Sequence, residues 1–264
     1  MKYTLLLRAG RLWCAGLVLF LLRLVQNLTG FDPETGLSLP SLPGTALVVC
    51  LALLALWELL RIRKLDKTKA PFSRRFASPD KETAFLAAGS LLLVAGGLLM
   101  AMSGLGSGGG EGVAAIAAGV TGAVSGGCIL MLGKQMRDGG EVTVGPLLPA
   151  MFFGVFLVLA IYLPAADDPV LARYWLPVLS SAMAAYAFSQ LAGFLRGESS
   201  PRGFTPVADL AVMLCVASLA DGGLGQDLLL GGCALVLTVF LLLQRDTPQA
   251  PVQRPEPAEE PEEA

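Results

Sequence analysis

Eight apolar stretches alternate with short polar connectors along the chain. A transmembrane helix needs about 20 predominantly apolar residues, and the ten-residue alternation that marks a membrane β-barrel is absent from the sequence. The pattern therefore predicts an all-α, polytopic bundle of about eight transmembrane helices in one domain, residues 1–244. The expected spans are residues 3–28, 45–62, 83–103, 112–133, 146–163, 175–195, 206–220 and 227–244.

The seventh stretch, residues 206–220, is the weakest of the eight because it is short and carries an aspartate, Asp209, in its first turn. Thr205 is its expected N-cap residue and Pro206 its first helical residue. If this stretch does not cross, the chain has seven spans, and the last span and the tail reverse their direction. We prefer eight spans.

Small residues recur in the fourth stretch, where Ala118, Gly122 and Gly126 follow one another at intervals of four. Side chains of this size let two helix backbones approach closely in lipid. We therefore expect residues 112–133 to form a central packing helix of the bundle.

The segment Arg61–Glu82 holds eight of the 19 Lys and Arg residues and lies between two apolar stretches. A basic loop of this kind stays on the cytoplasmic side, so we expect both termini inside (N-in and C-in). Phe72 and Phe76 are four apart, which predicts a short turn on the membrane surface with its rings in lipid. The expected partner of Arg61–Arg75 is anionic lipid in the bilayer rather than nucleic acid.

The composition excludes several functions but adds little to the predicted fold. Charged residues are 15% of the chain, against roughly 25% in soluble domains, and 54% of the residues are hydrophobic. The chain has no His, which is the usual general base and the commonest transition-metal ligand. HExxH, GxSxG, CxxC and Walker motifs are also absent. We therefore expect no catalytic residue, cofactor or metal, and no enzymatic activity.

Three charged residues inside apolar stretches are the candidate functional residues: Arg23, Glu58 and Asp209. Charged groups at membrane depth are costly and mark transport paths or ion pairs. Arg23 stands near the end of the first span, where its long side chain can snorkel to the headgroups, the alternative being a buried ion pair. Glu58 stands three residues before Arg61, so these two side chains can meet on one helix face.

The last 20 residues, 245–264, are rich in Pro and Glu and contain no apolar cluster. Such a composition cannot form a packed core. We expect a disordered cytoplasmic tail.

The segment Phe31-Asp32-Pro33-Glu34-Thr35-Gly36-Leu37 follows a basic N-terminal span. It resembles the first outer loop of uncharacterised multi-pass membrane proteins of bacteria, a likeness that covers about the first 45 residues. The resemblance implies a bacterial cytoplasmic membrane and no particular activity. The order of loops in spans one to four is also repeated in spans five to eight, though in poor register. These features favour a small permease or transport component; the alternative is a non-catalytic scaffold, sensor or partner subunit with an unknown protein partner.

Overall fold

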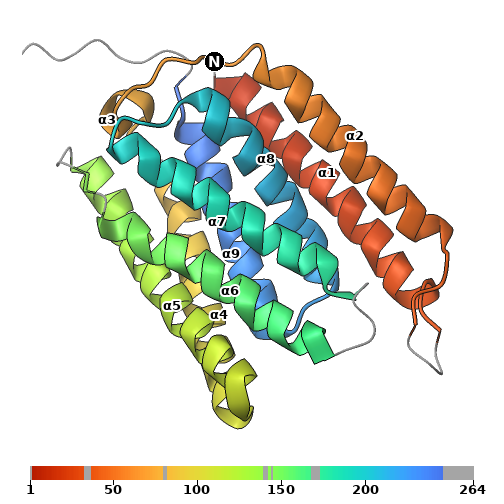
Figure 1. Ribbon diagram of the computed structural model, residues 1–264. Helices are drawn as coiled ribbons and strands as arrows, with labels where there is room; N and C mark the ends of the chain where they lie inside the picture. The colour runs from red at the N-terminus through yellow and green to blue at the C-terminus, as the bar shows by residue number, and fades with distance from the viewer. Residues whose placement is uncertain are drawn as a thin grey trace, which may run out of the picture.

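The protein is a bundle of long helices packed side by side (Figure 1). The computed structural model describes residues 2–32, 37–79, 82–138, 142–143, 145–167 and 173–245. The long helices are α1 (Lys2–Thr29), α2 (Leu42–Ile62), α4 (Thr83–Gly106), α5 (Gly109–Arg137), α6 (Leu148–Asp167), α7 (Trp175–Leu195), α8 (Pro201–Ala217) and α9 (Leu224–Leu243). The short helices are α3 (Phe72–Arg75), η1 (Gly145–Leu147) and η3 (Ser218–Ala220).

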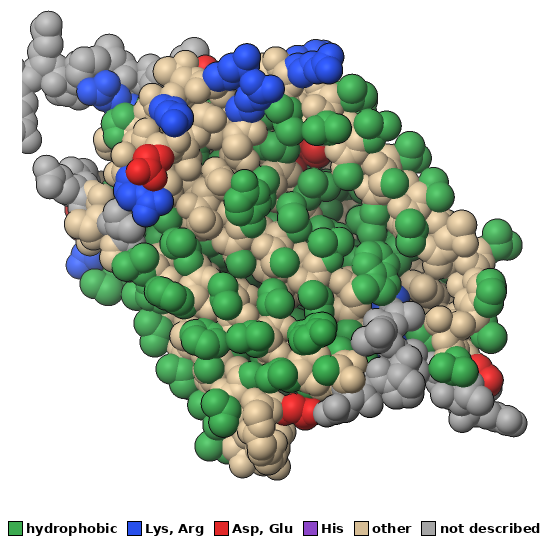
Figure 2. Space-filling model, viewed as in Figure 1, with side chains coloured by type: hydrophobic (Ala, Val, Ile, Leu, Met, Phe, Trp, Pro, Cys, Tyr) green, Lys and Arg blue, Asp and Glu red, His purple; other side chains and the backbone are tan. Residues whose placement is uncertain are grey.

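The predicted all-α fold with eight apolar helices is confirmed. Each of the eight is long and apolar enough to cross a membrane, including the segment Pro201–Ala220, which removes the reason for a seven-span chain. α1 begins, and α2 and α9 end, at one end of the bundle, which we call the basic end because Lys and Arg side chains gather there (Figure 2). On the face shown in Figure 2 the flanks between the two ends are covered by hydrophobic side chains.

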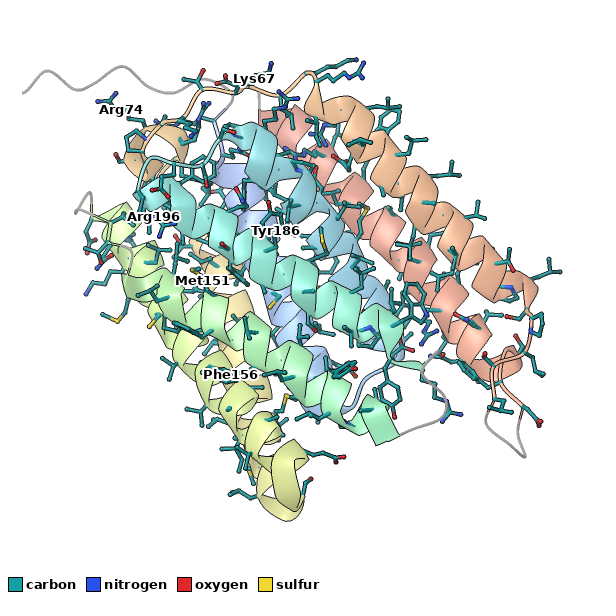
Figure 3. All side chains as sticks on the ribbon, in the orientation of Figure 1. Lys67, Arg74, Met151, Phe156, Tyr186 and Arg196 are labelled. Atoms are coloured by element: carbon teal, nitrogen blue, oxygen red, sulfur yellow. The ribbon has the colours of Figure 1, made fainter. Side chains whose placement is uncertain are left out.

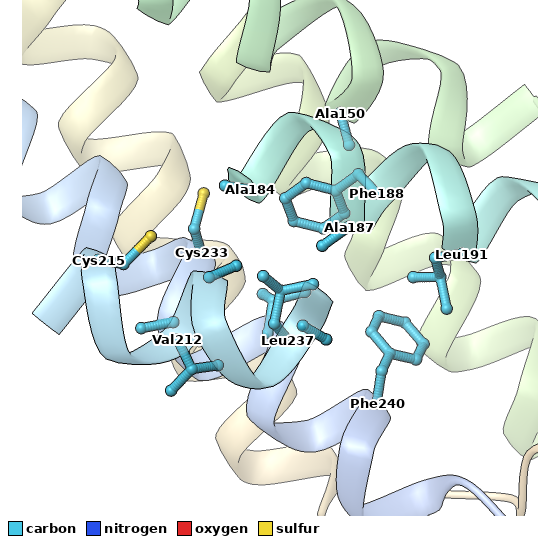
Figure 4. Close-up of a cluster of buried hydrophobic side chains, with 14 of the residues drawn as sticks. Ala150, Ala184, Ala187, Phe188, Leu191, Val212, Cys215, Cys233, Leu237 and Phe240 are labelled. Carbon is cyan, nitrogen blue, oxygen red and sulfur yellow. The ribbon is translucent and has the colours of Figure 1, made fainter. Parts of the chain in front are cut away.

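The centre of the bundle is formed by α8 and α9, not by the fourth span as predicted. In the apolar window of α8, 72% of the residues are buried, against 39% in α5 and 11% in α2. α7, α8 and α9 contribute most of the central side chains, among them Phe188, Val212 and Leu237 (Figure 4). The small residues of α5 were a sign of close contact with one neighbour, which does not require a central position.

That neighbour of α5 is α4, and the predicted close approach of backbones is confirmed. A Cβ built on Gly119 would lie 2.4 Å from the backbone nitrogen of Ala101 and 2.5 Å from the carbonyl oxygen of Gly97. A Cβ on Gly126 would lie 2.5 Å from the carbonyl oxygen of Ser90. Because backbone atoms cannot move aside as a flexible side chain can, only glycine allows this packing distance.

α8 begins earlier than the sequence indicated. Its N-cap residue is Ser200 and its first residue is Pro201, so Thr205 and Pro206 lie inside the helix. The Thr205 hydroxyl donates a hydrogen bond to the side-chain oxygen of Gln244 at 2.9 Å. The earlier start lengthens the helix enough to cross a membrane and moves Asp209 from the first turn to the ninth position.

Another helix start also differs from the prediction, whereas α4 begins at Thr83 as expected. α9 begins at Leu224, with Gly223 as its N-cap residue, rather than at Asp227. The predicted disordered tail is residues 245–264, of which 246–264 lie outside the described residues.

The packing does not reproduce the repeated loop order. In a duplication of four spans, α2 and α4 would correspond to α7 and α8. α7 packs along α8, whereas α2 lies against α1 and α8, on the far side of the bundle from α4 (Figure 1). The two halves therefore contribute to the bundle in different ways.

The segment 66–77, which we call the strap, lies against the basic end rather than on the membrane surface as predicted. Phe72 and Phe76 are stacked with ring centroids 4.4 Å apart, and each has only 3% of its surface exposed. The edges of Phe194, Phe204 and Phe240 surround Phe76. The two rings therefore fill the core between α7, α8 and α9 instead of entering lipid.

Hydrogen bonds hold the strap in this position. The guanidinium of Arg75 is fully buried and donates to the Asp66 carboxylate at 2.7 Å and to the Thr68 carbonyl oxygen at 2.8 Å. The backbone of Ala77 donates to the carbonyl oxygen of Leu243 at the end of α9. Side chains of Lys67 and Arg74 point away from the bundle (Figure 3).

Protonation or neutralisation of Asp66 should release the strap. A hydrogen bond from the Thr68 backbone, together with the Arg75 guanidinium, lowers the pKa of Asp66 to about 2. A lowered pKa contributes stability above the ordinary value, so this contribution should be lost as the pH falls from about 4 to about 2. At neutral pH, Asp66→Asn should raise the rate of tryptic cleavage at Lys67 and Arg74 about tenfold, measured by mass spectrometry. The control Glu198→Gln should leave the rate unchanged; an equal rate in both variants would show that Asp66 does not hold the strap.

The N-in, C-in topology stays a prediction that one label can test. α1 starts and α9 ends at the same end of the bundle, which requires both chain ends on one side if all eight helices cross. In a chain whose five cysteines are replaced, Ala250→Cys should react with an impermeant maleimide only after the membrane is opened. Reaction in intact cells would contradict the predicted orientation.

Candidate functional site: two buried ion-pair clusters and an end cavity

Four charged side chains from three helices meet near the basic end, and we call them the basic-end cluster: Arg8, Glu58, Arg61 and Asp209. Arg8 Nη2 donates to both carboxylate oxygens of Asp209, at 2.8 and 2.7 Å. Arg61 Nη1 donates to Oδ2 of Asp209 at 2.7 Å and lies 3.3 Å from each carboxylate oxygen of Glu58. The two guanidiniums and two carboxylates balance in charge.

The burial of the two carboxylates in this cluster explains why arginines pair with them. Asp209 is fully buried and Glu58 is 4% exposed, while the side chains of Arg8 and Arg61 keep 22% and 27% of their surface exposed. Asp209 lies about 12 Å along α8 from Pro201, at 1.5 Å per residue. A carboxylate this deep is stable only if it is paired, and α1 and α2 each bring one arginine that reaches it from the end of the bundle.

A second cluster, which we call the opposite-end cluster, joins α1 to the turn after α8. Arg23 Nε donates to the two carboxylate oxygens of Asp221, at 2.6 and 2.8 Å. Its two other nitrogens donate to the side-chain oxygen of Gln26 at 2.9 Å and to the carbonyl oxygen of Arg173 at 2.8 Å. Arg23 is fully buried, so it does not snorkel; the ion pair, the alternative interpretation, is the one that the structure contains.

Asn27 completes this cluster. Its side-chain nitrogen donates to Asp221 at 2.8 Å and to the Ala220 carbonyl oxygen at 2.9 Å. Burial raises the pKa of the Asp221 carboxyl, while the charge of Arg23 and these hydrogen bonds act in the opposite direction. Arg23, Asn27 and Asp221 thus tie α1 to the end of α8, as Arg8 and Asp209 do at the other end.

A cavity of about 360 Å³, which we call the end cavity, lies beside the opposite-end cluster. Polar groups on its wall include Asn27, Arg173, Asp221 and Gln226. The guanidinium of Arg173 stands 5.0 Å from the centroid of the Phe31 ring. The lining is Asn27, Phe31, Ala160, Ile161, Pro164, Arg173, Tyr174, Pro177, Ala220, Asp221 and Gln226.

The basic end is closed at the corresponding place. A narrow cleft between α1 and α9 runs beside Arg8, and it has no room for a water molecule. Its walls are Arg8, Ala9, Leu12, Thr238, Leu241 and Leu242. The two ends of α1 therefore differ: one borders an open cavity and the other a packed cleft.

The structure brings Glu58 and Asp209 together and places Arg23 in the other cluster. The predicted contact of Glu58 with Arg61 is confirmed. Sequence reasoning missed Arg8, near the start of the first expected span, and Asp221, in the connector before the eighth. One signal was available: Arg8 and Arg23 are 15 residues apart, about four helical turns, so both can face the same neighbouring helix.

Two serines of α7 make ordinary hydrogen bonds to their own helix. The hydroxyls of Ser180 and Ser181 both donate to the carbonyl oxygen of Pro177, the expected bonding within their own helix. Among the residues that the structure describes, no three His, Cys, Asp or Glu side chains gather in a way that could hold a metal ion.

Eight long apolar helices, in which the buried charges Arg23, Glu58 and Asp209 are all ion-paired, define a multi-pass helical membrane protein. Beyond that class, no family model, curated protein or solved structure matches the chain. The class therefore rests on the physical properties of these helices alone.

Proposed function

We propose that the protein is a small permease or transport component in which α1 moves against α8. One observation carries the proposal: buried ion-pair clusters close the α1–α8 interface at both ends, and a cavity opens beside one cluster while the other is packed. Alternating access needs a path that is open at one end and closed at the other. The arrangement fits one such state, with the end cavity as the entrance.

The interface between the clusters is suited to such a movement. A Cβ on Gly16 would lie 2.9 Å from the Cβ of Val216, so α1 approaches α8 closely there without a large side chain between them. The layer between the clusters is apolar and includes Leu12 and Leu19, both buried. In this proposal, opening the basic end requires Asp209 to separate from Arg8 and Arg61.

Accessibility of single cysteines tests the proposal without a known solute. In a chain whose native cysteines are replaced, Gln226→Cys reports on the end cavity and Leu12→Cys on the closed cleft. Arg61→Gln weakens the basic-end cluster and should increase the reactivity of position 12 toward an impermeant thiosulfonate about tenfold, while that of position 226 falls. The matched control is Arg196→Gln, in an exposed ion pair with Glu198. Unchanged or parallel reactivity at both positions would overturn the proposal.

A second candidate is a non-catalytic scaffold, sensor or partner subunit. It is favoured by the contact of the strap with the start of the tail, where the Arg245 backbone donates to the Arg75 carbonyl oxygen at 2.7 Å. The strap and the first residue of the tail thus lie side by side at the basic end. Removing residues 246–264 distinguishes the two candidates. If the protein is a permease, the cysteine reactivities at positions 12 and 226 should stay unchanged. If it is a scaffold, the shortened chain should no longer complement a deletion strain.

The proposal assigns no catalytic role to the protein, because Arg23, Glu58 and Asp209 all serve ion pairs. It places the chain in the bacterial cytoplasmic membrane, with anionic lipid along the segment Arg61–Arg75. Within that segment Arg61 and Arg75 are engaged with carboxylates, so the cations available to lipid are the exposed ones. These are Arg63, Lys64, Lys67, Lys69 and Arg74.

A further inference from the structure

A separate groove lies between α4 and α5 at the basic end, and its volume is about 250 Å³. α4 begins and α5 ends beside it, so the two helices are side by side along its whole length (Figure 1). The residues that line it are Thr83, Leu86, Ala87, Leu130, Gly133, Lys134, Arg137 and Asp138. We call this the α4–α5 groove.

Polar and apolar groups are separated along the groove. Lys134 and Arg137 belong to the last turn of α5 and form its rim. Leu130, one turn further from that end of α5, and the buried Leu86 of α4 form the apolar part of the lining. A Cβ on Gly133 would lie 2.7 Å from the Cδ2 atom of Leu86, so the glycine is what leaves space for that side chain.

The rim is positively charged. Lys134 and Arg137 are three residues apart, on one helix face, and both are exposed. Among the described residues, neither takes part in an ion pair, unlike Arg8, Arg61 and Arg75. Asp138 is the one acidic residue of the lining, which leaves the groove with a net charge of +1 from two cations and one anion.

We propose that the α4–α5 groove binds an anionic phospholipid, with the phosphate between Lys134 and Arg137 and an acyl chain along Leu86 and Leu130. Basic pockets between membrane helices bind acidic lipid headgroups, and each cation near such a headgroup contributes about 1 kcal/mol. Free phosphate would use the same two cations but would gain nothing from the apolar wall. The groove therefore matches a lipid in both of its parts.

The experiment compares lipids on the delipidated full-length protein in detergent. Native mass spectrometry should show phosphatidylglycerol binding more tightly than phosphatidylcholine. The double variant Lys134→Gln with Arg137→Gln should weaken phosphatidylglycerol binding about 30-fold, because two charge contacts are lost. A matched control, Arg11→Gln with Arg202→Gln, removes two cations that lie outside the groove and outside the segment Arg61–Arg75, and it should keep at least a third of the wild-type affinity.

Three outcomes would overturn the inference. The first is equal affinity of the double variant and the wild type for phosphatidylglycerol. The second is an equal loss of affinity in the control Arg11→Gln with Arg202→Gln, which would make the effect one of overall charge. The third is that inorganic phosphate displaces phosphatidylglycerol when the two are present at equal concentrations. This result would show that the apolar wall contributes nothing to binding. Thermal unfolding of both variants without lipid should match the wild type, since neither pair of residues is ion-paired in the structure.

Discussion

Replacing Asp209 with asparagine should lower the free energy of unfolding by about 3 kcal/mol, one of the two largest effects expected of a single substitution in this protein. The carboxylate is fully buried and accepts hydrogen bonds from two guanidiniums. Asparagine is uncharged, so Arg8 and Arg61 would face each other with only Glu58 to balance them. The loss of stability is measured by thermal unfolding in detergent, with size-exclusion chromatography to monitor the folded fraction.

Two further variants decide why Asp209→Asn is destabilising. Arg8→Met with Asp209→Met removes one cation and one anion, and Arg61 keeps Glu58 as its partner. This neutral replacement should be less destabilising than Asp209→Asn alone, because no charge is left without a partner. Glu198→Gln, in the exposed pair with Arg196, should change stability by less than about 1 kcal/mol. If Asp209→Asn unfolds at the wild-type temperature, the cluster does not hold these helices together.

The same reasoning limits what a simple test of function can show. Neutralising Glu58 and Asp209 would tell a transporter from a scaffold only if both variants stayed folded. Because Asp209 joins three helices, its loss would affect a scaffold as well. Arg61→Gln is a better choice, since Asp209 keeps its two hydrogen bonds from Arg8.

Gly119→Leu should separate α4 from α5 and lower the free energy of unfolding by about 3 kcal/mol. The first carbon of any side chain at this position would lie 2.4 Å from a backbone nitrogen of α4. Backbone atoms cannot rotate away, so the two helices must move apart. They then lose van der Waals contacts, which hold helices together in lipid, where the hydrophobic effect does not act between them. The yield of folded protein and its unfolding temperature in detergent both report the change.

The matched control is Gly127→Leu, on the same helix. A Cβ built on Gly127 meets no atom within 4 Å, so the new side chain points into open space. This variant should be neutral or slightly stabilising, because leucine has a higher helix propensity than glycine. Equal losses at positions 119 and 127 would indicate that glycine flexibility, and not close packing, matters in α5.

A residue of the site could be predicted only where its position in the sequence is unusual for its type. Arg23, Glu58 and Asp209 were found because a charge inside an apolar stretch is visible in the sequence. Arg8 and Asp221 were missed because Arg8 stands at the basic start of the first span and Asp221 in a connector between spans, where charges are ordinary. Phe72 and Phe76 were misplaced for a related reason: their spacing is the same whether the rings face lipid or a core.

The sequence by itself determined the eight apolar helices and the gathering of basic residues at one end. Both depend on neighbouring residues in the chain, because the cost of placing a segment in a bilayer is a sum over its own side chains. The tertiary structure alone decided that α8 and α9 are central, that the strap is buried, and which charges pair between helices. Arg8 and Asp209 are 201 residues apart, and Arg23 and Asp221 are 198 apart. Contacts between residues so far apart in the chain depend on how the helices pack. Within lipid, the shape of the helix surfaces decides which helices become neighbours, because all of them are hydrophobic.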